Sequence, residues 1–389
     1  MDMRSFQHIT PPLRLFSGPD SLGQLGRELD RLNSRRAVIV CGSSLARDGS
    51  PLDLVRLAMG GRCAGVFCGV RAHSPVPAVE AAARELARLE ADAVVAVGGG
   101  SAIVTARAAS ILFAETGDAK TLATSRDERG ELRSPKLLAP KLPQLVIPTT
   151  PNTATVKAGS AVFDPVGGER LALFDPKTRA QSVFIHPELI NSAPRELVMS
   201  ASLDTLALAL EGLTSRSGDP ISDALLMHAV RLLAQNLPNQ ALGEDARGEL
   251  MLAAVLCGQG TDFTGAGIAT VLGHAIGGRY AVENGITKAI MLPHALRFNA
   301  DAAQSGVRKI ATALGLLRSE GQPVVTTIVD ALEAMFGQLG TPRRLRDVGV
   351  PQEDLSAIAT QGMADWFLRA NPRPVRSELE LRQVLQEAW

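Results

Sequence analysis

The stretch Ala91-Asp-Ala-Val-Val-Ala-Val-Gly98-Gly99-Gly100-Ser101 decides the fold of this 389-residue chain. Its apolar, β-branched part from Ala93 to Val97 is typical of a buried parallel strand. The glycines follow directly, and residues 102–113 have the composition of an alanine-rich helix. A strand, a glycine turn and a helix present free backbone N–H groups and a positive helix end to an anion. The pattern favours a pyrophosphate site, and the alternative is a tight strand-to-helix turn without a ligand.

Other apolar strands surround this stretch and alternate with helical segments over the first 150 residues. Ala37–Cys41 and Ala64–Cys68 precede it, and Leu145–Ile147 follows it. This alternation predicts a parallel, doubly wound sheet, whose ligands bind at the carboxyl ends of the strands. Glycine, serine and threonine residues follow three of these strands and form the predicted cofactor site. Its residues are Gly42, Ser43, Gly98, Gly99, Gly100, Ser101, Thr149, Thr150 and Thr153.

The second half of the chain has a helical period almost without interruption from Ser192 onward. The predicted helices are Arg195–Thr214, Ile221–Leu237, Ala246–Gly258, Gly265–His274, Thr287–Asn299, Val324–Leu339 and Glu378–Glu387. The sequence therefore predicts an α/β nucleotide-binding domain with a parallel sheet over residues 1–188. An all-α domain is expected over residues 189–389, with the active-site cleft between the two domains.

Charge and composition exclude several classes of protein. Lys plus Arg and Asp plus Glu number 40 each, which argues against nucleic acid or an anionic membrane as a partner. The N-terminus lacks a signal-peptide core, and no apolar run approaches the roughly 20 residues that span a bilayer. The four cysteines have no CxxC spacing and are expected to be buried thiols. We expect a cytoplasmic enzyme without a membrane segment.

Further motifs follow one another along the chain: Gly98-Gly-Gly-Ser101, Pro148-Thr-Thr150, Pro187-Glu-Leu189, Asp204 with Glu211, Ser222-Asp-Ala-Leu, His274-Ala-Ile-Gly-Gly278, Leu292-Pro-His294 and Phe298-Asn299. Together they resemble the iron-containing (group III) alcohol dehydrogenases, whose fold is shared by dehydroquinate synthases and glycerol dehydrogenases. The resemblance covers nearly the whole chain. It implies hydride transfer between a nicotinamide and an alcohol or carbonyl, and a homodimer.

The chain departs from this family at the metal site. The family holds a divalent metal with one aspartate and three histidines, and the matching positions here read Asp204, Leu208, Thr270 and Asn284. Leucine cannot bind a metal, and neutral hydroxyl and amide oxygens are weak ligands for Fe²⁺ or Zn²⁺. We expect no tightly bound metal. A metal site with relocated ligands such as His186 or His228 is the least favoured alternative, because neither has helical spacing to Asp204.

Two residues are predicted to be catalytic. His274 matches a family histidine close to the reacting centre and could deliver the proton that accompanies hydride transfer. Its alternative role is a helix histidine bonded to a backbone carbonyl. Asp204 is either an acid–base or hydrogen-bonding group, or a helix residue with a satisfied partner. Three cations in matching segments could bind an anionic substrate or lie on the surface: Lys157, Arg279 and Lys288.

The predicted cofactor site also departs from the family pattern. NAD-specific members carry an aspartate after the first long strand, where this chain has Gly42, Ser43 and Ser44. Loss of the carboxylate removes repulsion against a 2′-phosphate, so NADP is favoured over NAD. Arg107 replaces a family lysine. Asn152 stands at a family glycine, which a positive φ would accommodate.

These observations lead to a metal-independent NADP- or NAD-dependent oxidoreductase that interconverts a small carbonyl compound and an alcohol. By resemblance, the maleylacetate reductases are a related case without a metal, and they act on a substrate that bears a carboxylate. The alternative is a non-redox enzyme on the same fold, a lyase or cyclase, or a nucleotide-binding protein that has lost catalysis. This alternative is considered because the chain departs from the family pattern both at the metal-ligand positions and in the nicotinamide pocket.

Overall fold

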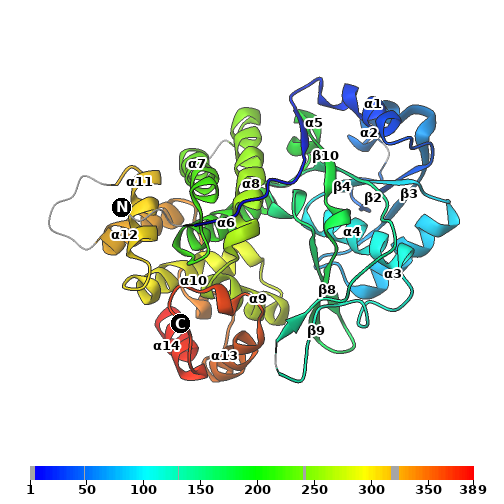
Figure 1. Ribbon diagram of the computed structural model, residues 1–389. Coiled ribbons are helices and arrows are strands. Elements are labelled where there is room, and N and C mark those ends of the chain that lie inside the picture. The colour runs from blue at the N-terminus through cyan, green and yellow to red at the C-terminus, as the bar shows by residue number, and fades with distance from the viewer. Residues whose placement is uncertain (1–4, 48, 130, 240–241, 317–323) are drawn as a thin grey trace. The chain divides into compact units, whose positions relative to one another are not determined.

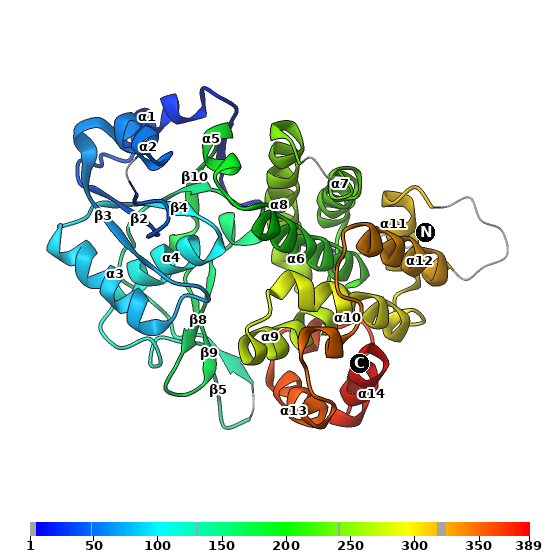
Figure 2. The same cartoon turned by 180° about the vertical axis from the view of Figure 1, so that it is seen from behind.

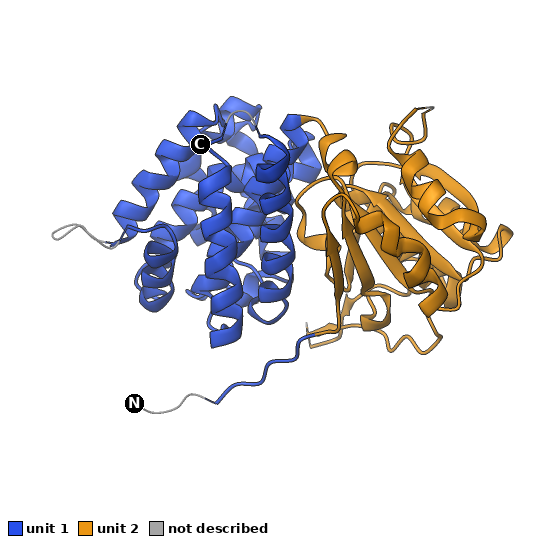
Figure 3. Cartoon of the chain, turned by 90° about the horizontal axis from the view of Figure 1, so that it is seen from above, with its two compact units in different colours: residues 1–10, 195–389 blue, residues 11–194 orange. Residues whose placement is uncertain are grey.

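The computed structural model describes residues 5–47, 49–129, 131–239, 242–316 and 324–389. The chain forms two compact units (Figure 3), an α/β unit of residues 11–194 and a helical unit of residues 1–10 and 195–389. The N-terminal segment, grouped with the α/β domain from sequence, thus belongs to the helical unit. Its His8 Nδ1 lies 3.2 Å from Asp219 Oδ2, and its ring lies 4.6 Å from the ring of Phe263.

A six-stranded parallel sheet forms the centre of the α/β unit (Figure 1), as the sequence predicts. Its strands, in spatial order, are β1 (Arg14–Ser17), β10 (Ala180–Ile185), β7 (Gln144–Pro148), β4 (Ala93–Gly98), β2 (Ala37–Gly42) and β3 (Cys63–Val70). The glycine-turn strand β4 is buried along its whole length between β2 and β7, which fits its uninterrupted apolar sequence.

Helices cover both faces of this sheet (Figures 1 and 2). They are α1 (Leu25–Arg31), α2 (Leu52–Met59), α3 (Val76–Arg88), α4 (Gly100–Ala114) and α5 (Pro187–Asn191). Ile39 and Val95 form a core with α1 and α2. Their neighbours Val94 and Ala96 point to the opposite face, because successive side chains alternate along a strand. Two antiparallel hairpins complete the unit: β5 (Ser125–Arg126) with β6 (Leu132–Arg133), and β8 (Gly159–Asp164) with β9 (Glu169–Phe174).

The described part of the helical unit contains the seven predicted helices and two that the sequence did not predict, α11 and α13. The helices are α6 (Arg195–Thr214), α7 (Pro220–Asn236), α8 (Glu244–Thr264), α9 (Ile268–Tyr280), α10 (Asn284–Asn299), α11 (Gln304–Ala313), α12 (Val324–Gln338), α13 (Leu355–Ala364) and α14 (Glu378–Ala388). Both parts of the predicted fold class, the parallel α/β sheet and the helical second half, are confirmed.

Helix α6 corrects one expectation. Its 20 residues are long and apolar enough to cross a membrane by length and composition, whereas the sequence was expected to contain no such run. However, 78% of its apolar window is buried inside the structure. It also carries Asp204 and Glu211, so its apolar character is that of a core helix.

Close helix contacts in the helical unit depend on glycine. A Cβ at Gly285 of α10 would lie 1.8 Å from the backbone oxygen of Ser200 on α6. On α9, a Cβ at Gly273 would lie 2.8 Å from Lys288 Cγ, and one at Gly277 would lie 2.6 Å from Asn284 Oδ1. These glycines let α6, α9 and α10 approach closely, and that brings together the positions that matched the family's metal site.

The cysteine expectation is confirmed for two residues and wrong for the others. Cys41 and Cys257 are buried, and burial raises the pKa of the Cys41 thiol to about 12. Cys63 is half-buried and Cys68 is exposed, because both lie on β3 at the edge of the sheet. All four are free thiols.

The α6–α10 contact gives a stability prediction. Gly285→Ala should lower the free energy of unfolding by about 3 kcal/mol or more, because a backbone oxygen cannot move aside for the new methyl group. The control is Gly278→Ala on α9, where a Cβ would meet nothing within 4 Å. The control should be neutral or stabilising by up to about 1 kcal/mol. Urea unfolding followed by circular dichroism measures both, and equal effects would contradict the close contact.

Candidate active site

The turn between β4 and α4 has a conformation and packing that require glycine. Gly98 has a φ of +140°, which side-chain-bearing residues rarely adopt. A Cβ at Gly98 would lie 3.0 Å from Ala102 Cβ, and one at Gly99 would lie 3.1 Å from Thr150 Oγ1. No side chain caps the N-terminus of α4. The first N–H groups of α4 therefore keep their capacity to bind an anion.

The three turns predicted to hold the cofactor meet at one edge of the sheet. Cys41 is paired with Val97, and Gly98 with Pro148, so the ends of β2, β4 and β7 are in register. Thr149 N donates to Gly98 O at 3.0 Å. The structure thus brings the predicted cofactor-binding residues of these turns together, from Gly42 and Ser43 to Gly98–Ser101 and the threonine turn of Thr149, Thr150 and Thr153.

Asn152 contributes a feature that the sequence did not reveal. Its φ is −123°, so Asn152 is accommodated at this position without the positive φ that was considered for it. The amide Nδ2 donates to Thr150 O at 2.9 Å, while Oδ1 is buried without a hydrogen-bond partner. A Cβ at Gly100 would lie 3.6 Å from this oxygen. An unpaired buried acceptor is costly, so a ligand hydroxyl or amide at the glycine turn would satisfy it.

Arg107 has a structural role that the sequence missed. Its side chain is fully buried on α4 and donates to Gly159 O at 2.7 Å and to Ala154 O at 2.5 Å. It thereby ties the segment after β7 to the helix that follows the glycine turn. A charged residue within the apolar Ala102–Phe113 segment was the available signal, because a buried arginine needs specific partners.

The four positions that match the family's metal ligands come from three helices and carry one carboxylate, one hydroxyl, one amide and one leucine side chain. Asp204 and Leu208 lie one turn apart on α6, Thr270 lies on α9, and Asn284 begins α10. Thr270 Oγ1 donates to Glu211 Oε2 at 2.6 Å instead of facing a metal. Across the described ranges there is no group of three His, Cys, Asp or Glu side chains that could hold a metal ion. The donor set does not fit Fe²⁺ or Zn²⁺.

The two histidines considered as relocated ligands have other partners. His186 Nδ1 accepts from Glu188 N at the start of α5, at 3.3 Å. His228 Nδ1 lies 2.9 Å from Arg231 Nη2 on the exposed side of α7. Both histidines therefore have partners of their own.

The ammonium of Lys288 contacts Asp204, the one metal-ligand residue of the family that this chain retains. Lys288 Nζ lies 2.6 Å from Asp204 Oδ1, with side-chain exposures of 3% and 24%. The sequence left open a substrate-binding or a surface role for this lysine, and the surface role is wrong. Arg279 is exposed and pairs with Asp354 at 3.3 Å, whereas Lys157 is half-buried in the α/β unit. Asp204 thus has a charged partner, and its catalytic role stays a prediction.

Glu211 is a second buried carboxylate near this lysine. It accepts from Ala269 N at 2.7 Å and from the Thr270 hydroxyl, so it caps the start of α9. Burial raises the pKa of Glu211, although these hydrogen bonds and the Lys288 charge oppose the shift. The threonine at the family's histidine position therefore stabilises a helix end.

His274 is paired with a carboxylate that the sequence did not identify. His274 Nδ1 lies 3.1 Å from Asp365 Oδ2, and the two side chains are 11% and 12% exposed. The ring of Phe367 lies 5.9 Å from the imidazole. A carboxylate on one ring nitrogen orients an imidazole and stabilises its protonated form, which suits a proton donor. The contact with Asp365 gives His274 a partner that neither predicted role included.

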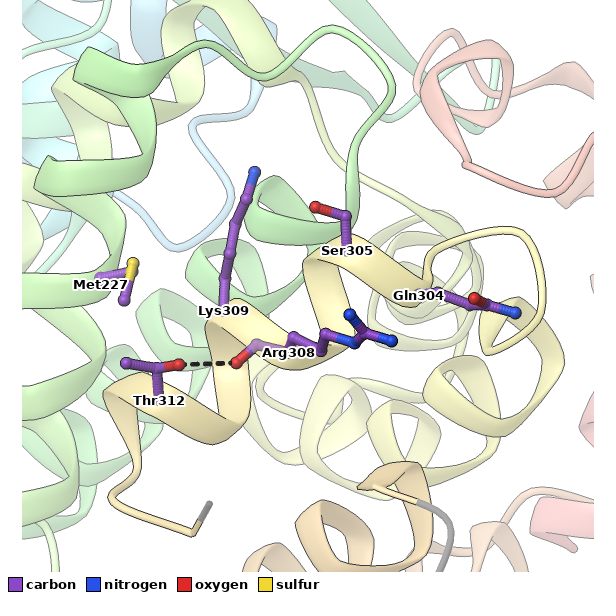
Figure 4. A pocket seen from close by; sticks show the side chains of 6 residues that line it. All are labelled: Met227, Gln304, Ser305, Arg308, Lys309 and Thr312. Atoms are coloured by element: carbon purple, nitrogen blue, oxygen red, sulfur yellow. Dashed lines mark hydrogen bonds between the residues drawn. The ribbon is translucent and has the colours of Figure 1, made fainter. Parts of the chain in front are cut away.

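Two other features of the helical unit lie apart from these residues. Burial lowers the pKa of His294 to about 4, so this motif histidine is neutral at pH 7. A pocket of about 560 Å³ lies between α7 and α11 (Figure 4), and it contains none of the predicted site residues. It is lined by Met227, Gln304, Ser305, Arg308, Lys309 and Thr312.

Known proteins resemble this chain over nearly its whole length. Residues 12–187 match the family "Iron-containing alcohol dehydrogenase", and residues 198–389 match "Fe-containing alcohol dehydrogenase family, C-terminal". Lactaldehyde reductase of Escherichia coli (strain K12) is 28% identical over 96% of this chain and 97% of its own. Maleylacetate reductase of Sphingobium indicum is also 28% identical, over 94% and 93% of the two chains.

A crystal structure of 1,3-propanediol oxidoreductase has the same fold. It superimposes with a TM-score of 0.90 over 99% of this chain and 100% of that one, at 24% sequence identity. The two family matches lie on the two structural units and leave few residues uncovered. The chain is therefore an alcohol dehydrogenase-like oxidoreductase that belongs to the iron-containing alcohol dehydrogenase family.

Proposed function

We propose that this protein is a metal-independent, NAD(P)H-dependent oxidoreductase that interconverts a small carbonyl compound and an alcohol. One observation carries the proposal: the glycine turn is intact, while the metal positions hold Asp204, Leu208, Thr270 and Asn284. The aspartate among them is already bound to the ammonium of Lys288.

The residues at the sheet edge fit a dinucleotide. The N–H groups at Gly99 to Ser101 would bind its pyrophosphate, because the helix end is positive and uncapped. The buried Oδ1 of Asn152 would accept from a ribose hydroxyl or the nicotinamide amide. Ser43 and Ser44 are exposed at the end of β2 and offer hydroxyl donors to a 2′-phosphate, which favours NADP over NAD.

His274 would move the proton. The reduced nicotinamide, when bound, supplies a hydride to the carbonyl carbon. The carbonyl oxygen then gains negative charge, and His274 transfers a proton to it, so that hydride and proton together convert carbonyl to alcohol. The imidazole takes the same proton in the reverse direction. Asp365 acts as a positioning residue through its contact with Nδ1.

The substrate is proposed to be small and in some cases anionic. The named relatives are a lactaldehyde reductase and a maleylacetate reductase, which supports a short carbonyl compound and permits a carboxylate. A balanced charge supports a protein that binds neither nucleic acid nor anionic membranes. We propose that it works in the cytoplasm. We also propose that the chain forms a homodimer.

Cofactor binding tests the first half of this proposal. Titration of the protein with NADPH, followed by nicotinamide fluorescence, should show saturable binding that is tighter than binding of NADH. Gly100→Val should raise the Kd for NADPH at least about tenfold by filling the turn. The control is Gly61→Val, because Gly61 is exposed and a Cβ there would meet nothing within 4 Å. No fluorescence change at millimolar NADPH would contradict the proposal.

His274 gives a separate test of the chemistry. His274→Asn should lower turnover about 10²-fold or more while the Kd for NADPH stays unchanged. Asp365→Asn should cost roughly tenfold, since the imidazole loses its orienting partner. His228→Asn is the matched control on the exposed face of α7 and should have no effect. Unchanged turnover in His274→Asn would remove this residue from the mechanism.

A further inference from the structure

We infer that Lys288 is an internal replacement for the metal cation, with its ammonium supplying the positive charge of the active site. This inference rests on the proposed metal-independent function and names the group that does the metal's electrostatic work. It is carried by the contacts of Lys288 with α6 and α9, none of which the sequence alone revealed.

The first contact is with the retained metal-ligand position. Lys288 Nζ and Asp204 Oδ1 are 2.6 Å apart, at the short end for an ammonium–carboxylate hydrogen bond. Asp204 matches the one metal ligand of the family that this chain retains. Here its carboxylate binds the ammonium of Lys288. The charge at this carboxylate is kept while the imidazole ligands around it are replaced.

The second observation is burial. The Lys288 side chain is only 3% exposed, and a buried ammonium is stable only with charged partners. Asp204 is one partner, and the buried Glu211 is close enough for the lysine charge to act on it. The lysine charge therefore acts on two carboxylates, on Asp204 by direct contact and on Glu211 through space. A fixed cation in such a setting is a specific feature of the site rather than a solvated surface charge.

The third observation is the close packing of α9 against the side chain of Lys288. A Cβ at Gly273 would lie 2.8 Å from Lys288 Cγ and 3.7 Å from Cε, so only glycine leaves room for this stem. Gly273 immediately precedes His274 in the sequence. The same turn of α9 therefore accommodates the cation and carries the proposed proton donor.

This arrangement has two chemical consequences. A preorganised ammonium can stabilise the negative charge that develops on a carbonyl oxygen during hydride transfer, which is the task of a Lewis-acid metal. It also repels a divalent cation from Asp204. Restoring the family's histidines should therefore fail to restore metal binding as long as Lys288 is present.

The test compares two variants by cobalt titration, with the visible absorption of bound Co²⁺ as the readout. The first is Leu208→His/Thr270→His/Asn284→His, and the second adds Lys288→Met. The second should bind Co²⁺ at least about a hundredfold more tightly than the first, because the repelling charge is gone. Equal binding by the two variants, including none by either, would overturn the inference. This readout needs no activity, so it is independent of whether the redox proposal is correct.

Single variants provide the second measurement, because the histidine substitutions at Thr270 and its neighbours could disturb folding. Lys288→Met should lower kcat at least about 10²-fold with the Kd for NADPH unchanged, and Lys288→Arg should retain part of the activity. The matched control is Lys309→Met, which removes another lysine paired with an aspartate, at 2.7 Å from Asp223. A kcat for Lys288→Met equal to that of the control would overturn the inference. Loss of NADPH binding in the unaltered protein would instead contradict the proposed function.

Discussion

The ion pair between Lys288 and Asp204 is the interaction on which this account of the helical unit depends. It joins α10 to α6 at a place where Gly285 already lets the two helices approach to backbone contact. Removing one partner of a buried pair leaves an uncompensated charge, which is far more costly than replacing both. The packing of α10 on α6 and the charged partner of Asp204 are therefore linked through one contact.

The α/β unit carries the residues that we propose bind the cofactor. Its glycine turn is defined by Gly98, by the register of β4 with β7, and by the hydrogen bond from Thr149 to Gly98. Arg107 then fixes the following segment onto α4. In the helical unit, by contrast, the metal ligands are replaced and a His274–Asp365 pair remains. The difference between the two units has a chemical reason, because backbone N–H groups suffice to bind a pyrophosphate, whereas a metal needs particular side chains.

The sequence predicted the elements whose signals are local. The apolar run of β4, the glycines after it and the helical period of α6 were enough to define the sheet and most of the helices. The identities at the four metal positions could also be read directly. What could not be predicted depends on contacts between distant segments. Asp365 lies far from His274 in the sequence, and nothing local distinguishes it from aspartates on the surface.

Burial was the other unpredictable quantity. A lysine on a helix is normally solvated, so Lys288 on the largely buried α10 gave no sign of its partner Asp204 until α6 and α10 were placed together. The same reason explains Arg107, whose partners are backbone oxygens with no sequence signature. Cys68 is the converse case, because an apolar strand reads as buried although β3 lies at a sheet edge. Asn152 adopts an extended backbone that its position at a family glycine did not suggest.

The measurement that tests metal independence most directly is the metal content of the active protein. The protein is purified from cells supplied with iron and zinc, and its metal is quantified per chain before and after chelation, with NADPH-dependent carbonyl reduction measured in parallel. The account predicts far less than one metal ion per chain and a kcat/KM that chelation does not change. One tightly bound iron or zinc ion per chain, with activity lost on its removal and regained on its return, would contradict it.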